Sequence, residues 1–462
     1  MKRFFFGVLV LLALSYAACS PALFVPCENA EDCKGLLQCI EGQCRHRYEG
    51  FTPIVQKIYG TTDCLQGIPK GASGKQTLHL FPVVGDYNRQ EALDLEYSAQ
   101  SPLQLSTASF AIVSDESSPV QVFNYETGER VTQAQAVLTI DASEPIQIKP
   151  NPRNTALRKN PGQWVPQAFF LGIDMSDNAL SQDNGALRTA APGSLILDVL
   201  DAHLSGTPYS ILSTILLRRG KLSPDDYLFR NWERKDDQLP AEQGGNDGFV
   251  VATRESVELF SERFISTGNP VSDGTAPLME GIAKMVQSLR KHAVQDGEQR
   301  YNPNAIVLSL SRGSAADQES KYLEAKKAIQ GSGNDFVPLQ AIVWSKPRKS
   351  DVLNPPSTEQ WNQHIERLCK LAHAGGTDES SFGHLFHIAP SVNRDRYKEQ
   401  LRSHLGAAFY ASKGYVAVRI QYKLSGVPSG GRYVIAFKVQ GTWLGRTSES
   451  RDSPYIYMTV EP

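Results

Sequence analysis

The hydrophobic pattern of this chain changes near residue 164 and again near residue 414, and these changes limit the folds that it can adopt. Before the first change, short apolar runs alternate with turn-forming residues, as in β structure. Between the two changes, apolar runs alternate with helical periods, as in a parallel sheet covered by helices. After the second change the β pattern returns. A single core stops growing at about 250–300 residues, so we expect this 462-residue chain to form more than one folding unit.

The middle segment, residues 163–411, is predicted to be a doubly wound, mostly parallel α/β sheet. Ala168–Ile173 is almost uninterrupted in its apolar character, which is typical of a strand buried on both faces. A helix is expected after Pro277, and a second helix begins at the capping box of Ser357 and Gln360. The remaining expected strands and helices are Ala305–Leu308, Asp317–Ile329, Phe336–Val343, His384–Ile388 and Tyr397–Phe409.

The flanking segments, residues 51–162 and 412–462, are predicted to form one β-sandwich. Phe110–Val113, Val120–Phe123 and Ala136–Ile140 are short apolar runs in the first segment. Alternating apolar and polar residues from Val416 to Leu424 indicate a strand in the second. Fifty residues are few for an independent domain, so we expect the C-terminal strands to join the earlier ones. The α/β segment would then be inserted in, or flanked by, a sandwich.

The N-terminus has the features of an export signal, predicted over residues 1–18. Lys2 and Arg3 precede an apolar stretch from Phe4 to Leu14, and small residues follow it. Tyr16 to Cys19 resembles a bacterial lipobox, which implies that Cys19 is lipidated and becomes the mature N-terminus. The absence of aspartate after this cysteine then implies an outer-membrane lipoprotein of the bacterial envelope. The alternative is ordinary cleavage that leaves a secreted protein.

The chain contains seven cysteines, and an odd number leaves one unpaired in an oxidising compartment. Lipidation of Cys19 would leave six. Four of these lie within residues 19–50, in a segment too short to build a core, so we expect disulfides rather than zinc there. Their spacings include no C-x₂-C pair, and their connectivity stays open. These four are Cys27, Cys33, Cys39 and Cys44.

The two cysteines outside the N-terminal module are Cys64 and Cys369. They are predicted either to pair, tying the first β segment to the α/β segment, or to remain separate, with Cys369 as a buried thiol beside the apolar stripe of its helix.

Three segments that follow expected strands resemble the metal loops of the von Willebrand factor A family, which includes integrin I domains. Asp174, Ser176 and Asn178 occupy the positions of its D-x-S-x-S motif. Thr275, just before the expected helix at Pro277, matches the threonine of the second loop. The third segment is Ser311 to Gly313, which follows the expected strand Ala305–Leu308. The resemblance covers roughly residues 164–410 and implies a Mg²⁺ site with oxygen ligands.

Two positions depart from the pattern of that family. Asn178 replaces a serine, although its side-chain oxygen can still face a metal. Arg312 replaces an aspartate and reverses a charge near the expected ion, which Asp177 or Asp317 would have to offset. The site is therefore predicted to be a degenerate adhesion-type metal site, or else a metal-free edge where Arg312 contacts a carboxylate of the ligand.

Other chemistry has little support in the sequence. His384 and His387 would project to opposite faces of one strand, and His364 and His373 to different faces of one helix, so neither pair is expected to share a metal. No nucleophile elbow, P-loop or H-E-x-x-H helix is found. A formal net charge of -2 gives no indication of nucleic-acid binding.

The sequence therefore predicts a lipid-anchored binding protein, not an enzyme, that takes a protein or surface ligand. The alternative is a metal-free structural or assembly lipoprotein of the cell envelope.

Overall fold

The computed structural model describes most of the two β segments and the regular elements of the α/β segment. The described residues are 37–40, 43–46, 53–86, 92–93, 108–116, 118–157, 165–174, 210–217, 222, 226–227, 229, 247–252, 277–295, 298–299, 301–309, 318–332, 335–344, 357–377, 380–389, 394–443, 446–448 and 453–462. The chain divides into one unit of residues 1–52 with 159–163, and a second of residues 53–158 with 164–462. Within the described part, no helix combines the length and the apolar character needed to cross a membrane.

The first unit contains a small hairpin. Its strands are β1 (Leu37–Ile40) and β2 (Gln43–His46), which pair antiparallel with Cys39 opposite Cys44. Cys19, Cys27 and Cys33 lie outside the described residues.

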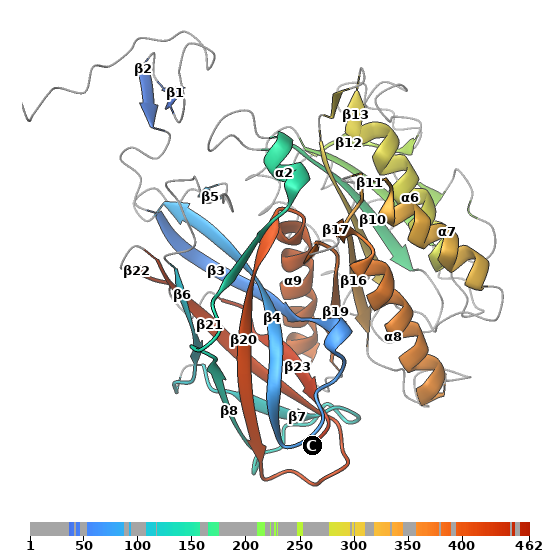
Figure 1. Ribbon diagram of the computed structural model, residues 1–462. Coiled ribbons are helices and arrows are strands. Elements are labelled where there is room, and N and C mark those ends of the chain that lie inside the picture. The colour runs from blue at the N-terminus through green and yellow to red at the C-terminus, as the bar shows by residue number, and fades with distance from the viewer. Residues whose placement is uncertain are drawn as a thin grey trace, which may run out of the picture. The chain divides into compact units, whose positions relative to one another are not determined.

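A six-stranded sheet forms the centre of the α/β segment (Figure 1). Its strand order is β12-β11-β10-β15-β16-β19, and β12 alone runs antiparallel to its neighbour. The strands are β10 (Gln167–Asp174), β11 (Ile211–Leu217), β12 (Val250–Val251), β15 (Asn302–Ser309), β16 (Leu339–Trp344) and β19 (His384–Ile388). Every residue of β10 is buried, in agreement with the uninterrupted apolar run in the sequence. The prediction of a mostly parallel α/β sheet is confirmed at this level.

Helices cover both faces of the sheet (Figure 1). Phe170 faces a core built with α6 (Leu278–Ala293), α7 (Gln318–Gln330) and α8 (Thr358–His373). Phe169, the next residue along β10, faces the opposite core, which α9 (Arg394–Ala411) completes. The alternation of side chains along a strand therefore distributes one apolar run between two cores.

Two antiparallel sheets contain strands from both flanking segments. The first sheet has the order β3-β4-β20-β8, with β5 beside β4 and β9 beside β20. In the second sheet, β21 pairs with β6, β7, β22 and β23. The strands of the first sheet are β3 (Pro53–Thr62), β4 (Ser73–Asp86), β5 (Ala92–Leu93), β8 (Gln135–Ile140), β9 (Gln147–Pro150) and β20 (Gly414–Ser425). Those of the second are β6 (Ser109–Val113), β7 (Gln121–Asn124), β21 (Tyr433–Trp443), β22 (Arg446–Thr447) and β23 (Ile456–Val460).

The α/β segment begins and ends at neighbouring strands of the first sheet. β9, followed by the short helix α2 (Pro152–Leu157), precedes it, and β20 follows it, with Gly414 opposite Pro150. Tyr59 and Phe81 of this sheet share a core with Leu401 and Leu405 of α9, so the sandwich and the α/β sheet belong to one packed unit. The remaining described elements are η2 (Cys64–Gln66) and the pairs β13 (Val294–Gln295) with β14 (Glu298–Gln299), and β17 (Gly376–Thr377) with β18 (Ser380–Ser381).

Candidate functional site

The order of the central sheet reverses between β10 and β15, because the chain continues from β10 to β11 on one side and returns to β15 on the other. Ligands of open α/β sheets bind at such a switch point, beyond the carboxyl ends of the strands. Asp174 is the last residue of β10 and Ser309 the last of β15, and each follows directly on the paired residues Ile173 and Leu308. Both side chains are fully buried. An acidic and a hydroxyl group therefore lie side by side at the switch point.

Ser309 is connected to the helix that follows β16. Its Oγ lies 3.2 Å from Nε2 of His364, and the Trp361 ring lies beside this imidazole. Burial lowers the pKa of His364 to about 4, and the nearby charge of Arg367 acts in the same direction. The imidazole is therefore neutral at pH 7. The sequence analysis did not identify this pair, although Ser309 closes an apolar strand and His364 lies among the buried positions of its helix.

The other residues proposed from the family resemblance lie outside the described part of the chain. They are Ser176, Asn178, Thr275 and Arg312, together with Asp177 and Asp317. Asp174 lies at the carboxyl end of β10, a central strand of the sheet. Its carboxylate is a hard oxygen donor of the type that Mg²⁺ prefers, so this residue fits the expected ion.

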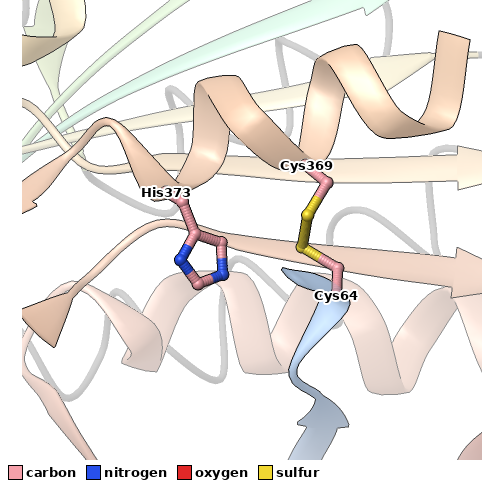
Figure 2. Close-up of side chains that lie close together, drawn as sticks. All are labelled: Cys64, Cys369 and His373. Atoms are coloured by element: carbon pink, nitrogen blue, oxygen red, sulfur yellow. A yellow bond between two sulfur atoms is a disulfide. The ribbon is translucent and has the colours of Figure 1, made fainter. Parts of the chain in front are cut away.

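A second group of chemically active side chains lies around a disulfide between Cys64 and Cys369 (Figure 2). Their sulfur atoms are bonded and their Cα atoms are 5.9 Å apart. The bond joins η2, next to the first sheet of the sandwich, to the last turns of α8. Of the two alternatives left open by the sequence, the structure contains the paired one.

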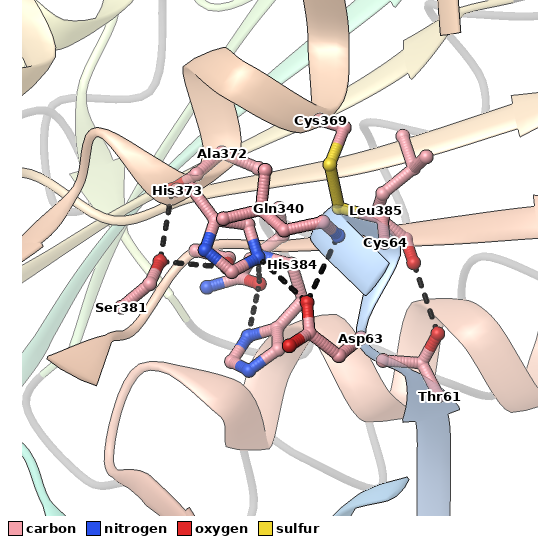
Figure 3. Close-up of a disulfide and its surroundings, with 12 residues drawn as sticks. Thr61, Asp63, Cys64, Gln340, Cys369, Ala372, His373, Ser381, His384 and Leu385 are labelled. Carbon is pink, nitrogen blue, oxygen red and sulfur yellow. Dashed lines mark hydrogen bonds and ion pairs between the residues drawn. A yellow bond between two sulfur atoms is a disulfide. The ribbon is translucent and has the colours of Figure 1, made fainter. Parts of the chain in front are cut away.

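Charged and aromatic groups surround this disulfide (Figure 3). Oδ1 of Asp63 lies 3.2 Å from Nε2 of His373. The His79 and His384 rings lie in edge contact nearby, with centroids 5.1 Å apart. Burial lowers the pKa of His79 to about 4, against the opposing effect of the Asp63 charge. His384 and His387 contact different partners, His79 and Tyr125, in agreement with their expected positions on opposite faces of β19.

A cavity of about 530 Å³ adjoins the disulfide. Asp63, Cys64 and Cys369 line one part of it, and Tyr125 and His387 line another. It brings together residues of η2, α8, β19 and the second sheet of the sandwich, which no local sequence pattern connects.

No family model matches the sequence, and no curated protein matches it. Solved structures match parts of the fold. BatB from Bacteroides thetaiotaomicron is 14% identical, over 52% of this chain and 98% of that chain, with a TM-score of 0.29. The manganese-loaded TRAP protein of Plasmodium vivax is 10% identical, over 71% of this chain and 98% of that chain, also with a TM-score of 0.29. The pilus adhesin SpaC from Lactobacillus rhamnosus GG is 8% identical, over 76% of this chain and 48% of that chain, with a TM-score of 0.32. The strand order of the chain's own sheet, rather than these likenesses, supports the function proposed below.

Proposed function

We propose that this chain is a binding protein, rather than an enzyme, whose α/β segment is of the von Willebrand factor A type and takes a protein or surface ligand. The observation that carries this proposal is the buried carboxylate of Asp174 at the switch point of a parallel sheet. The carboxyl edge of such a sheet is where this architecture places its ligands. The chain segments that follow β10 and β15 would therefore supply the contacts to the ligand.

Asp174 would hold a Mg²⁺ ion together with Ser176, Asn178 and Thr275. The bound ion supplies a positive charge that a carboxylate of the ligand completes. Ser309, which bonds the neutral imidazole of His364, fixes the end of β15 beside Asp174. Arg312, from the segment after β15, would contact the same ligand carboxylate.

We further propose that the chain is exported and anchored to the bacterial outer membrane through lipid on Cys19. The export signal supports this proposal, as does the Cys64–Cys369 disulfide, because such bonds persist in oxidising compartments. Mass spectrometry of the native N-terminal peptide tests it. A diacylglyceryl adduct on Cys19 is expected, and an unmodified N-terminus beyond this residue would contradict it.

The metal proposal is tested by calorimetric titration of EDTA-treated protein with Mg²⁺ and Mn²⁺. Saturable binding is expected for the natural chain and is lost in Asp174→Asn, which keeps the side-chain shape but removes the charge. Asp141→Asn is the matched control, because it neutralises another buried carboxylate, on the sandwich. Absence of both heat and any shift in melting temperature would favour the alternative, a metal-free scaffold of the cell envelope.

A further inference from the structure

The disulfide lies near the opposite edge of the α/β sheet from Asp174. α8 follows β16 and precedes the parallel strand β19, so its first turn lies toward the carboxyl edge and its last turn toward the amino edge. Cys369 and His373 belong to the last turns. The surroundings of the disulfide are therefore separate from the proposed ligand edge.

Three groups that bind thiophilic metals meet at this point. The Sγ atoms of Cys64 and Cys369 and a ring nitrogen of His373 all lie within 4.8 Å of one another (Figure 2). Cys369 and His373 are four positions apart on α8, so both project from one face of the helix. A carboxylate oxygen of Asp63 lies 3.2 Å from Nε2 of His373 and so holds the imidazole beside the two sulfurs (Figure 3). In the disulfide state the two sulfur atoms are bonded to each other and cannot act as thiolate ligands.

We propose that reduction of the Cys64–Cys369 disulfide converts this cluster into a Zn²⁺ site with Cys64, Cys369 and His373 as ligands and Asp63 orienting the imidazole. Two sulfurs and one imidazole nitrogen are donor types that Zn²⁺ takes, and water fills the fourth position of the tetrahedron. The same two segments, η2 and α8, are then joined either by the disulfide or by the metal ion.

The chemical step is thiol–disulfide exchange with a dithiol reductant. A thiolate of the reductant attacks one sulfur of the disulfide, and the other sulfur leaves as a thiolate. The second thiol of the reductant then releases the protein cysteine, so two electrons and two protons pass to the protein and the reductant becomes a disulfide. Zn²⁺ binding displaces the two protons from the cysteine thiols.

Asp63 and Cys64 are held in place by hydrogen bonds that do not involve the disulfide. The backbone N–H of Asp63 donates to the carbonyl oxygen of Thr77 at 3.0 Å. Nε2 of Gln76 donates to the carbonyl oxygen of Asp63, and Nε2 of Gln66 donates to Oγ1 of Thr77. Reduction removes none of these contacts with β4, so Asp63 and Cys64 stay opposite α8 when the bond opens.

The cavity provides access for the reductant and the ion. Cys64 and Asp63 line its wall together with Cys369. Cys369 is almost fully buried, whereas Cys64 is partly exposed, so Cys64 is the sulfur open to attack.

Cobalt absorption tests this proposal on the full chain, because Co²⁺ bound by thiolates gives a sulfur-to-metal charge-transfer band. Protein is reduced with a phosphine under nitrogen, titrated with Co²⁺ and then with Zn²⁺. The natural chain is expected to bind one more equivalent of Co²⁺ than the Cys64→Ala/Cys369→Ala variant. His373→Ala and Asp63→Asn, which keep both thiols, should each weaken binding at least about tenfold. Cys39→Ala/Cys44→Ala is the matched control, because it removes two cysteines from the other folding unit and should keep the additional equivalent.

A stability measurement on the same proteins separates loss of the site from loss of the fold. Zn²⁺ should raise the melting temperature of the reduced natural chain and leave that of reduced His373→Ala unchanged. Equal stoichiometry in the natural chain and the double alanine variant would overturn the proposal. An unchanged affinity of His373→Ala for the metal would overturn it as well, since the two thiolates alone would then account for binding.

Discussion

Buried histidines should make the stability of this protein strongly dependent on pH below neutrality. His79, His364 and His404 are almost fully buried, and desolvation lowers the pKa of the first two to about 4 and that of His404 to about 3. In the unfolded chain the same imidazoles titrate near about 6.5. As the pH falls below this value the unfolded state takes up protons that the folded state excludes, so stability decreases until the folded groups titrate as well.

The size of the effect follows from the difference between the two pKa values. At pH 5 each of the three imidazoles is almost fully protonated when unfolded and mostly neutral when folded, which costs about 2 kcal/mol per group and about 6 kcal/mol for the three. A domain is typically stable by only about 5–15 kcal/mol. Acidification from pH 7 to pH 5 should therefore remove a large part of the free energy of unfolding.

Urea unfolding at constant ionic strength, at half-unit steps from pH 8 to pH 5, measures this dependence. We expect a flat free energy of unfolding above pH 7 and a decrease of at least about 3 kcal/mol per unit between pH 6 and pH 5, because the pKa values of His384 and His387 are lowered as well. His404→Gln should reduce that slope by about 1 kcal/mol per unit, whatever it does to stability at pH 8. A flat profile, or the same slope in His404→Gln, would show that the folded protein accommodates these protons and would refute the reasoning.

Three further substitutions test other parts of the fold by denaturant unfolding. Cys64→Ala/Cys369→Ala opens a loop of 305 residues, and the chain-entropy relation predicts that the free energy of unfolding falls by about 5–6 kcal/mol. A decrease below about 1 kcal/mol would mean that the bond constrains the unfolded chain little. Gly331→Ala places a Cβ against the carbonyl oxygen of Asp335 at a φ of 60°, so we expect a loss of about 1–3 kcal/mol, and wild-type stability would contradict the strain. Asn302→Ala removes the donor to three buried oxygen acceptors and should cost about 3 kcal/mol, whereas a neutral effect would mean that water replaces the amide.

Much of the α/β segment could be predicted because its elements have strong local signals. The apolar run Ala168–Ile173 lies within β10, and the capping box of Ser357 and Gln360 opens α8 with both of its hydrogen bonds formed. Strand β11 was not predicted, although Ile211–Leu217 is mostly apolar, because Ser213 and Thr214 interrupt its apolar run.

Strand order and long β strands were harder to predict. β10 pairs with β11 on one side and with β15 on the other. The residues of β10 do not indicate the second pairing, because it depends on packing between segments that are distant in the sequence. β4 extends over fourteen residues and includes Pro82, which has no N–H to donate and therefore weakens the strand signal. Its partner β20 is more than 300 residues away in the sequence, so only the tertiary fold brings the two together.

The candidate sites differ in how far the sequence could reveal them. The position of Asp174 at the end of a strand could be predicted, because the apolar run before it is recognisable in the sequence. The Asp63–His373 contact could not, because it joins a turn of the first β segment to the end of a helix more than 300 residues later. The Ser309–His364 contact could not be predicted either, because the two residues lie on different elements.

The two edges of the α/β sheet have different physical characters. Toward the amino edge, the amide of Asn302 at the start of β15 bonds Gln167 and the carbonyl oxygen of Ser412, and the disulfide attaches the end of α8 to the sandwich. These contacts fix the sheet as a platform.

At the carboxyl edge, Asp174 marks the point where the chain leaves β10, and the residues expected to complete the site belong to the segments that follow the strands. Specificity in such folds comes from those connecting segments, while the sheet only positions them. Exchange of residues 175–200 for an unrelated sequence should therefore change which ligand binds while the urea midpoint stays nearly constant, and a collapse of the midpoint would show that this segment belongs to the platform instead.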